Sequence, residues 1–427
     1  MKTKRTLPLC AALACTAAFA ASTSGVRRTP YTKEEAAALG APPGAAKMVA
    51  VGNLVFPSAV YGSAQNPLRQ VEEVVERTHA LLTGYGLGIG NMLQHTIVLK
   101  DGAASPMDVL TRFHATATRL APSLKERRSV GTIIRVPGFH DPRTAVMLEI
   151  VAGAPSKKEQ AGDGYIRIPF TFGPQEIVET IGDDRLAFTA GLEAMDFEHG
   201  TLAPKIDEQV AAIAGKLDAA LKRAGLSLNH MVQHNLYITR GTDPLHVIRR
   251  FHEEVHKRAP EVKQYPSAGT VMVVDGMAAP GFLMEMDAVA ARGRPESLRR
   301  VPFTETSMEV AKAVVADGLV YLTAMPGADF AAAMTVPESV DAQIEAAVGN
   351  VRAALEQAGL SLANIVKHRI IVKKGAADPA RVRARFYEVA LRYAPALRDN
   401  PSAETFLIVE ALAGVRRSFE LAVIAAR

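Results

Sequence analysis

Three histidines are the most conspicuous residues that could do chemistry in this sequence. His95 and His234 are 139 residues apart, and His234 and His368 are 134 residues apart. Three histidines form a known zinc-binding set, and a three-fold arrangement of the chain would bring them together. In the alternative, each histidine begins a strand and is hydrogen-bonded to a neighbouring repeat. We favour this alternative because no carboxylate accompanies the histidines, so we expect neither a metal nor any other cofactor.

Each histidine lies in one copy of a longer pattern that occurs three times. The segments 84–100, 224–239 and 358–373 align with one another. An Arg-Phe pair and then an Ala-Pro pair follow each segment at a nearly constant offset: Arg112-Phe113, Arg250-Phe251 and Arg385-Phe386, then Ala121-Pro122, Ala259-Pro260 and Ala394-Pro395. A period of this length is too long for a solenoid, so each copy is expected to be a small domain. The predicted domains are 47–155, 164–293 and 301–427.

The hydrophobic pattern predicts the elements that position the histidines. Within one repeat the predicted order is strand, strand, helix, strand, helix, strand, strand. This order predicts an α+β fold with two helices on one face of a mixed sheet. Gly359 ends the first helix of the third repeat, as a glycine after a helix commonly does. In the third repeat, the predicted strands are 318–323, a strand from His368, 405–409 and 419–424, and the predicted helices are 340–358 and 379–393.

The first twenty residues have the features of an export signal. Three basic residues precede an apolar run over 7–19 that is too short to span a bilayer, and 18–20 reads Ala-Phe-Ala, a small-x-small cleavage site. We expect residues 1–20 to be a signal peptide, residues 21–46 to be a flexible leader, and the protein to be periplasmic or secreted. Lipidation of Cys15, as in a bacterial lipoprotein, is the less favoured alternative. No later segment is apolar enough to predict a membrane span.

Removal of this signal changes what the composition implies. Both cysteines lie in it, and the formal charge of +5 falls to about +2 without its three basic residues. A disulfide scaffold, a cysteine nucleophile and a cysteine zinc site are then excluded. A nucleic-acid-binding protein is not expected either, because the remaining chain is nearly neutral.

The repeats resemble the Rid (YjgF-type) family of enamine and imine deaminases. The resemblance rests on Val51-Gly-Asn-Leu-Val-Phe-Pro-Ser58, on the segment from Ala358 to Lys367, and on a closing apolar strand that begins with a glutamate. It implies three tandem Rid-like, chorismate-mutase-like domains. Family members are usually homotrimers with ligand clefts between subunits, so the fused chain is expected to be a monomer that forms a pseudo-trimer.

The resemblance also implies which residues form a site. The family's arginine, which holds a substrate carboxylate, corresponds to Arg128, with Arg127 as a rival; Ser129 and Ser58 are expected to help bind the substrate. Neither 265–269 nor 400–404 contains an arginine. Only one of the three clefts is therefore expected to keep this carboxylate anchor.

A glutamate on the last strand is the second group that the resemblance implies. Glu149, Glu285 and Glu420 are taken as equivalent, with Glu149 assisting attack of water on an imine carbon. For Glu285 and Glu420 a structural pairing with a nearby arginine is favoured. With this alignment, 136–143 appears as a longer turn in repeat 1, because 21 residues separate Arg128 from Glu149 and only 17 separate Ala268 from Glu285.

The sequence thus leads to two hypotheses of different classes. In the first, the protein is an exported hydrolase that deaminates an enamine or imine of a small carboxylate at an inter-repeat cleft, with Arg128 and Glu149 as catalytic residues. In the second, it is a small-molecule binding protein that kept the fold and lost the chemistry, since fold alone does not determine function.

Overall fold

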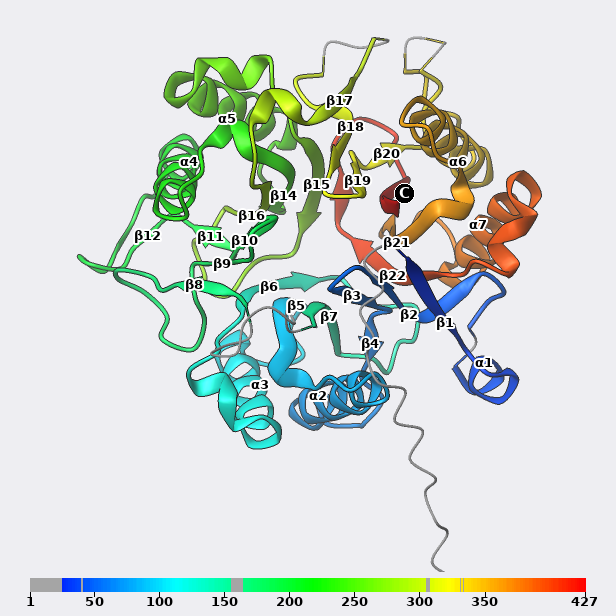
Figure 1. Cartoon of the computed structure of the whole chain (residues 1–427), viewed down its shortest axis with the longest axis horizontal. Helices are drawn as coiled ribbons and strands as arrows, with labels where there is room; N and C mark the ends of the chain where they lie inside the picture. Colours follow the sequence, from blue (N-terminus) through cyan, green and yellow to red (C-terminus); the bar gives the residue numbers. More distant parts are fainter. Residues whose placement is uncertain (1–24, 40, 155–163, 305–307, 331, 333) are drawn as a thin grey trace, which may run out of the picture.

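A computed structural model describes residues 25–39, 41–154, 164–304, 308–330, 332 and 334–427. The predicted signal peptide lies outside these residues. The described chain forms three similar units around a common centre, with strands inside and helices outside (Figure 1). None of its described helices has the length and apolar character needed to cross a lipid bilayer.

The first unit contains the two expected long helices and the expected strands. Helix α2 begins after Asn66, whose side chain accepts hydrogen bonds from the first-turn amides, and Pro67 occupies the first helical position. The elements are β2 (Ala45–Val51), β3 (Leu54–Pro57), β4 (Val60–Tyr61), α2 (Pro67–Thr83), β5 (Met92–Lys100), α3 (Pro106–Leu120), β6 (Val130–Val136) and β7 (Val146–Gly153).

The second unit repeats this order with additional short strands before its first long helix. It contains β8 (Ile166–Ile168), β9 (Thr180–Gly182), β10 (Leu186–Thr189), β11 (Leu192–Glu193), β12 (Met195–Asp196), β13 (Thr201–Leu202), α4 (Ile206–Arg223), β14 (Met231–Thr239), α5 (Pro244–Arg258), β15 (Ala268–Val274) and β16 (Met284–Ala291).

The third unit has the same plan. It contains β17 (Arg299–Pro302), β18 (Ala311–Ala316), β19 (Leu319–Leu322), β20 (Met325–Pro326), α6 (Val340–Gln357), β21 (Ile365–Lys373), α7 (Pro379–Tyr393), β22 (Ser402–Val409), β23 (Ala411–Leu412) and β24 (Phe419–Ala426).

The strand order is the same in the three units. In the first unit it is β2-β3-β7-β5-β6, in the second β9-β10-β16-β14-β15, and in the third β18-β19-β24-β21-β22. One pair in each unit is parallel, namely β5–β6, β14–β15 and β21–β22, and the helix between its two strands makes the crossover. The α+β fold predicted from the sequence is confirmed, with two long helices against a mixed sheet in each unit.

The segment expected to be a flexible leader contains regular structure. Residues Val26–Pro30 form β1, which pairs antiparallel with β2, and Lys33–Leu39 form helix α1. Strands β8 and β17 pair with β9 and β18 in the same way. The three strands share the pattern Arg-x-Pro-aromatic, at 28–31, 167–170 and 300–303. The repeat therefore begins near residue 26, and the leader prediction fails there because this strand completes the sheet edge.

The arginine of this pattern connects neighbouring units. Arg28 donates to the Pro401 carbonyl at 2.8 Å, Arg167 to the Arg128 carbonyl at 3.0 Å, and Arg300 to the Pro266 carbonyl at 3.1 Å. Each acceptor stands just before the last parallel strand of the neighbouring unit. Since these arginines are partly buried, their charged hydrogen bonds help to fix the units against one another.

Two hydrophobic clusters are shared by all three units. One contains Phe56, Phe188 and Tyr321, and the other contains Ile134, Met272 and Leu407, in each case one residue from each unit. The helices of each unit cover a separate core of their own. The shared clusters show that the three units pack against one another and form one body.

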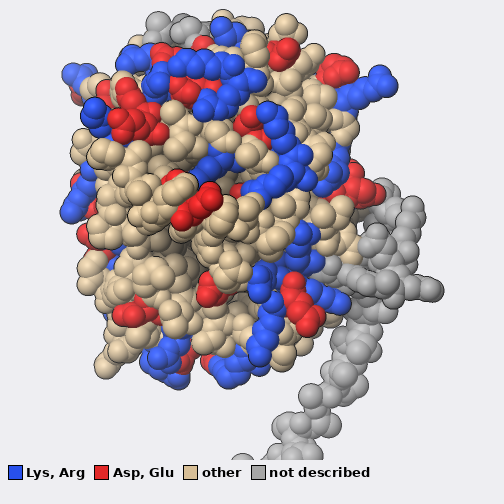
Figure 2. Space-filling model, turned by 90° about the vertical axis from the view of Figure 1, so that its left-hand side faces the viewer, with Lys and Arg blue, Asp and Glu red and all other residues tan. Residues whose placement is uncertain are grey.

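The surface on the side where α4 and α5 lie carries charges of both signs. Figure 2 shows that Lys and Arg side chains stand next to Asp and Glu in most of its charged groups. Uncharged residues cover much of the rest. This face therefore presents no continuous basic field.

We predict that Arg300→Ala lowers the free energy of unfolding by about 2–3 kcal/mol, because several backbone carbonyls lose a charged donor. The side chain also donates to Pro295 and Asn229. Urea unfolding followed by circular dichroism measures the loss. The exposed Arg294→Ala is the matched control, and an equal effect of both changes would contradict the proposed connection.

Candidate functional site

The three histidines have the same structural surroundings in each unit. Each lies on the strand between the last strand and the parallel strand of its unit. Its Nδ1 is hydrogen-bonded to a serine at the start of the parallel neighbour: His95 to Ser129 at 3.1 Å, His234 to Ser267 at 2.9 Å and His368 to Ser402 at 2.9 Å. Each ring also packs against the phenylalanine of the repeated Arg-Phe pair.

The histidines are buried and do not form a metal site. Burial lowers the pKa of His95 and of His234 to about 3, so both rings are neutral. Among the described residues no group of three or more His, Cys, Asp or Glu could hold a metal ion. Ser129, predicted to help bind substrate, is hydrogen-bonded to the His95 ring and also lines a cavity together with Arg128.

The strand register fixes which glutamates are equivalent. His95, His234 and His368 face Ile150, Ala288 and Val423 across the antiparallel pair. Counting from these pairs, Glu149 corresponds to Asp287 and Ala422. Glu285 and Glu420 correspond instead to Met147. The predicted equivalence of Glu149, Glu285 and Glu420 is wrong, because it matched side-chain type and not the register set by the histidines.

The same register removes the predicted long turn of the first repeat. The connection from the parallel strand to the last strand runs over 137–145, 275–283 and 410–418, which is the same length in all three units. Since the three histidine-bonded serines are equivalent, Arg128 corresponds to Pro266 and Pro401. The predicted insertion of four residues arises because Ala268 lies two positions after the true equivalent of Arg128, and Glu285 lies two positions before the true equivalent of Glu149. The observation that the first unit alone has an arginine here still holds.

Arg128 lies at the surface between the first and second units. Its Nε donates to the Lys125 carbonyl at 3.1 Å, and both residues line a cavity of about 350 Å³ together with His114 and Glu176. Arg127 is exposed. A carboxylate could reach Arg128 in this cavity. Glu149, however, does not line it.

Glu149 lies at the centre of the molecule, where the three units meet. Lys367 Nζ is 3.0 Å from its carboxylate, Arg369 Nε is also 3.0 Å away, and Thr405 donates to it at 2.9 Å. Burial opposes ionisation, but Arg369 and Lys367 outweigh it and lower the pKa of Glu149 to about 2. The cavity beside it measures only about 50 Å³. The predicted catalytic pair of Arg128 and Glu149 is therefore not brought together, because Glu149 points to the axis.

The axial network continues into the second unit. Arg369 donates to Asn235 at 3.3 Å, and Asn235 donates to Asp287 at 2.6 Å. Tyr237 donates to the other oxygen of Asp287 at 2.9 Å. The third unit thus supplies the cations at the axis, and the first and second units supply the acidic side chains.

The cleft between the second and third units, called here the 2/3 cleft, combines an acid with a cation in a larger space. It measures about 490 Å³ and contains Glu420, which is 3% exposed. Arg417 Nη1 lies 3.4 Å from the Glu420 carboxylate. Burial raises the pKa of Glu420 to about 7, although Arg417 opposes this shift. Glu420 is thus ionised in part near neutral pH, as a general acid or base should be.

Other side chains of the 2/3 cleft complete its lining. His252 Nδ1 is 3.1 Å from Glu309, and burial lowers the pKa of His252. The remaining wall is mainly apolar and includes Ile248, Val271 and Val310. Sequence reasoning missed Arg417, because it looked for an arginine only before the parallel strand. The position of Arg417, three residues before Glu420, was the feature of the sequence that indicated this pair.

Ser58 lies between the third and first units, in what we call the 3/1 cleft. Its hydroxyl donates to the Ala46 carbonyl at 2.6 Å and accepts from the Glu404 amide at 2.8 Å. The 3/1 cleft measures about 440 Å³. The Ser58 hydroxyl is thus hydrogen-bonded to two backbone groups in the wall of this cleft.

Comparisons with known proteins relate this chain to one family. The family model described as Endoribonuclease L-PSP matches residues 175–292, which form most of the second unit. No curated protein matches the sequence.

Solved structures similar to this chain include one match that covers most of it and several that cover 30% of it. A chorismatase is 13% identical, with 79% of this chain and 93% of that chain covered and a TM-score of 0.48. A YjgF-family protein of Mycobacterium tuberculosis is 25% identical over 30% of this chain and 99% of its own, with a TM-score of 0.25. TdcF of E. coli with bound serine is 22% identical over 30% of this chain and 94% of its own, also with a TM-score of 0.25.

We predict that Glu149→Gln lowers the free energy of unfolding by roughly 3–5 kcal/mol, because two buried cations lose their carboxylate. The folded-state pKa of Glu149 is depressed to about 2, so its contribution is complete above about pH 4.5 and is lost as the pH falls toward 2. The difference in stability between wild type and variant should narrow over that interval. The exposed Glu126→Gln is the control. Unchanged stability with lost activity would contradict the structural role.

Proposed function

We propose that this chain, whose second unit matches the Endoribonuclease L-PSP family model, is a hydrolase that deaminates the imine of a small carboxylic acid in the 2/3 cleft. The observation that carries the proposal is Glu420, a buried carboxyl with a pKa of about 7 beside Arg417 in a cavity of about 490 Å³. Cavities of this size accept small metabolites.

Arg417 and Glu420 divide the work of binding and proton transfer. Arg417 can take the substrate carboxylate as a bidentate partner. A substrate carboxylate bound to Arg417 neutralises the positive charge beside Glu420. Glu420 is then more readily protonated. Glu420 then donates its proton to the imine nitrogen, which makes the imine carbon more electrophilic.

Hydrolysis follows with water as the second reactant. The oxygen of water bonds to the imine carbon, and the Glu420 carboxylate takes the proton that water releases. The resulting carbinolamine receives a proton from Glu420 on its nitrogen, the carbon–nitrogen bond breaks, and ammonia leaves. Glu420 recovers its proton from the hydroxyl that becomes the ketone. The net reaction converts imine and water into ketone and ammonia.

The positions equivalent to Glu420 in the other two units lack a carboxyl paired with a cation. Glu285, at the equivalent position in the second unit, is buried and its pKa is raised well above normal by burial. Among the ion pairs of the described residues none involves it. The first unit has Met147 at this position. Among the described residues, a carboxyl at this strand position with a cation beside it is therefore found in the third unit.

We predict that Glu420→Gln reduces deamination by roughly 10²-fold or more, the usual range for loss of a general acid or base. The assay measures ammonia from a 2-imino acid that an amino-acid oxidase generates in situ. Arg417→Ala should mainly raise KM. Arg128→Ala, in a different cleft, is the control and should match wild type. The pH profile of kcat/KM in wild type should show a group near pH 7.

The outcomes separate the hydrolase from the binding protein. The protein would be a binding protein and not a hydrolase if ammonia release equals the buffer rate while the corresponding 2-keto acid binds measurably at Arg417. Loss of activity in Arg128→Ala with full activity in Glu420→Gln would move the site to the cleft between the first and second units.

We also propose that the protein acts outside the cytoplasm as a monomer. The basic start, short apolar run and Ala-Phe-Ala site at 18–20 support export. We predict that the periplasmic form begins at Ala21 and sediments as one chain. Intact mass and analytical ultracentrifugation test both points, and a full-length cytoplasmic protein would contradict the export proposal.

A further inference from the structure

We propose that the cavity on the central axis binds one small inorganic anion, such as chloride, among hydrogen-bond donors from all three units. This cavity, called here the axial cavity, measures about 50 Å³ and lies where the three units meet. It is distinct from the clefts between two units. Gln94 of the first unit, Gln233 of the second and Lys367 of the third line it. Each unit thus contributes a donor to one enclosed space.

Gln94, Gln233 and Lys367 occupy the same position in their units. Each immediately precedes the histidine of its strand. A shift of register just before this position recurs in all three units, and irregularities of this kind change the direction of a side chain. Since successive residues of a strand point to opposite faces, these three side chains point to the axis while the histidines pack against the helices. The strands therefore direct two amides and one ammonium group into the axial cavity.

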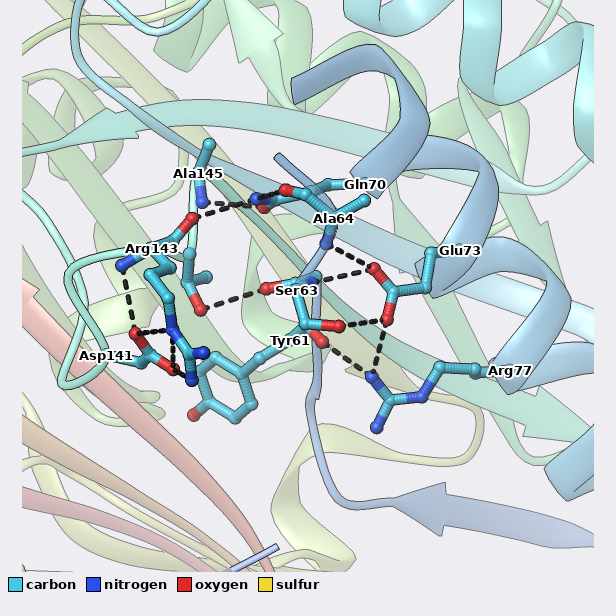
Figure 3. Close-up of polar contacts among 11 residues, drawn as sticks. Tyr61, Ser63, Ala64, Gln70, Glu73, Arg77, Asp141, Arg143 and Ala145 are labelled. Carbon is cyan, nitrogen blue, oxygen red and sulfur yellow. Dashed lines mark hydrogen bonds and ion pairs between the residues drawn. The ribbon is translucent and has the colours of Figure 1, made fainter. Parts of the chain in front are cut away.

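The two glutamines of the axial cavity differ from the buried glutamine of helix α2. Gln70 donates to two backbone carbonyls, those of Ala64 and Arg143 (Figure 3). Gln94 and Gln233 make no side-chain hydrogen bond to the described residues, and their amides keep surface that is accessible to the cavity. Gln233 is nevertheless only 7% exposed. A buried amide without a protein partner favours a ligand that accepts its hydrogen bond.

The two cations of the third unit also have donors left for the axial cavity. Lys367 Nζ donates to the Pro57 carbonyl at 2.9 Å and lies 3.0 Å from Glu149, which leaves one of its three N–H groups. Arg369 uses Nε toward Glu149 and Nη1 toward Asn235, and its Nη2 has no partner in the described part of the chain. Arg369 keeps 19% of its side-chain surface accessible although it stands at the axis. Charged donors therefore join the two amides in the cavity.

The acids beside the axial cavity argue against a cation as its ligand. Glu149 and Asp287 already accept two or more hydrogen bonds each from neighbouring side chains. A bound cation would need these oxygens and would stand beside Lys367 and Arg369, which repel it. Burial raises the pKa of Asp287, and an anion at the axis would favour its protonated form further. The groups that remain for a ligand are mainly donors, two of them charged, and this combination favours an anion.

The size and the lining of the axial cavity limit the anion to a small one. A single water needs roughly 10–15 Å³ of such a space. A cavity of about 50 Å³ therefore accepts a halide ion with at most a few waters and is too small for the substrates proposed for the 2/3 cleft. Phe56, Phe188 and Tyr321, one from each unit, form an apolar part of its wall. They keep the effective dielectric constant low, which strengthens the attraction between the two cations and an anion.

Urea unfolding of the full chain tests the proposal at constant ionic strength, with sodium gluconate replaced stepwise by sodium chloride. The unfolding midpoint should rise with the chloride concentration and then level off, because an ion that binds only the folded state stabilises it. Sodium bromide should act as chloride does. Gln233→Met keeps the length of the side chain, removes the amide, and should weaken the apparent chloride affinity roughly tenfold. The exposed Gln264→Met is the matched control and should respond as wild type does.

A second variant changes the charge of the axial cavity in the opposite direction. Glu149→Gln removes a negative charge beside Lys367 and Arg369, so this variant should bind chloride more tightly than wild type does, even though it is less stable. The location of the ion is tested by crystallography. Crystals grown in bromide should show an anomalous difference peak within hydrogen-bond distance of Lys367 Nζ.

Several outcomes would overturn the anion site. An unfolding midpoint that does not depend on chloride, or that depends on it equally in wild type and Gln233→Met, would mean that the axial cavity holds only water. Stronger stabilisation by sodium gluconate than by choline chloride would assign the cavity to a cation. Absence of the bromide peak at the axis would move any chloride effect to another part of the molecule.

Discussion

The buried ion pairs at the axis are the interaction on which the arrangement of the three units depends. Glu149 of the first unit lies between Lys367 and Arg369 of the third, and Asp287 of the second unit is linked to Arg369 through Asn235. In a trimer of identical subunits, equivalent positions would place three like charges at one axis, which a buried site does not tolerate. Fusion into one chain permits unlike residues at these positions. The network therefore specifies which unit stands next to which, and it holds the sheets that form every cleft.

The repeats and the order of their elements could be predicted from the sequence, because hydrophobic periodicity and the recurring histidine, Arg-Phe and Ala-Pro signals are local. The extra edge strand was missed, although Arg28, Arg167 and Arg300 recur at nearly the same offset as the histidines. A strand of five residues among Ala, Pro and Gly gives a weak periodic signal, and its pairing partner lies in β2. A comparison that carried the repeat period back to the N-terminus would have found it.

The candidate site was harder to predict because it depends on strand register. Alignment by residue type made Glu149 equivalent to Glu285 and Glu420. The pairing of each last strand with its histidine strand shows instead that Glu149 lies two positions further along than the other two. Two positions along a strand keep a side chain on the same face but move it about 7 Å. That distance separates the axis, where Glu149 serves the assembly, from the clefts, where Glu420 meets Arg417. The relevant arginine also stands on a different element from the one that the resemblance indicated.

The clefts can differ because backbone hydrogen bonds join their walls. Gly191, Ala324 and Ala59 donate their amides to the carbonyls of Gly131, Gly269 and Glu404, and these bonds need no particular side chain. The histidine–serine bonds lie inside single units. A glycine at 131 and 269 is required where the histidine ring stands closest, since an added Cβ would lie 2.4 Å from His95 Nε2 and 2.8 Å from His234 Nε2. At the third position Glu404 is accommodated, and Tyr387 and Arg383 then take up its charge and hydrogen bonds. Because these backbone hydrogen bonds are independent of side-chain type, the linings of the clefts can differ. The 2/3 cleft is mainly apolar with a titrating acid, and the 3/1 cleft is polar with balanced charge, although the same kind of assembly holds both.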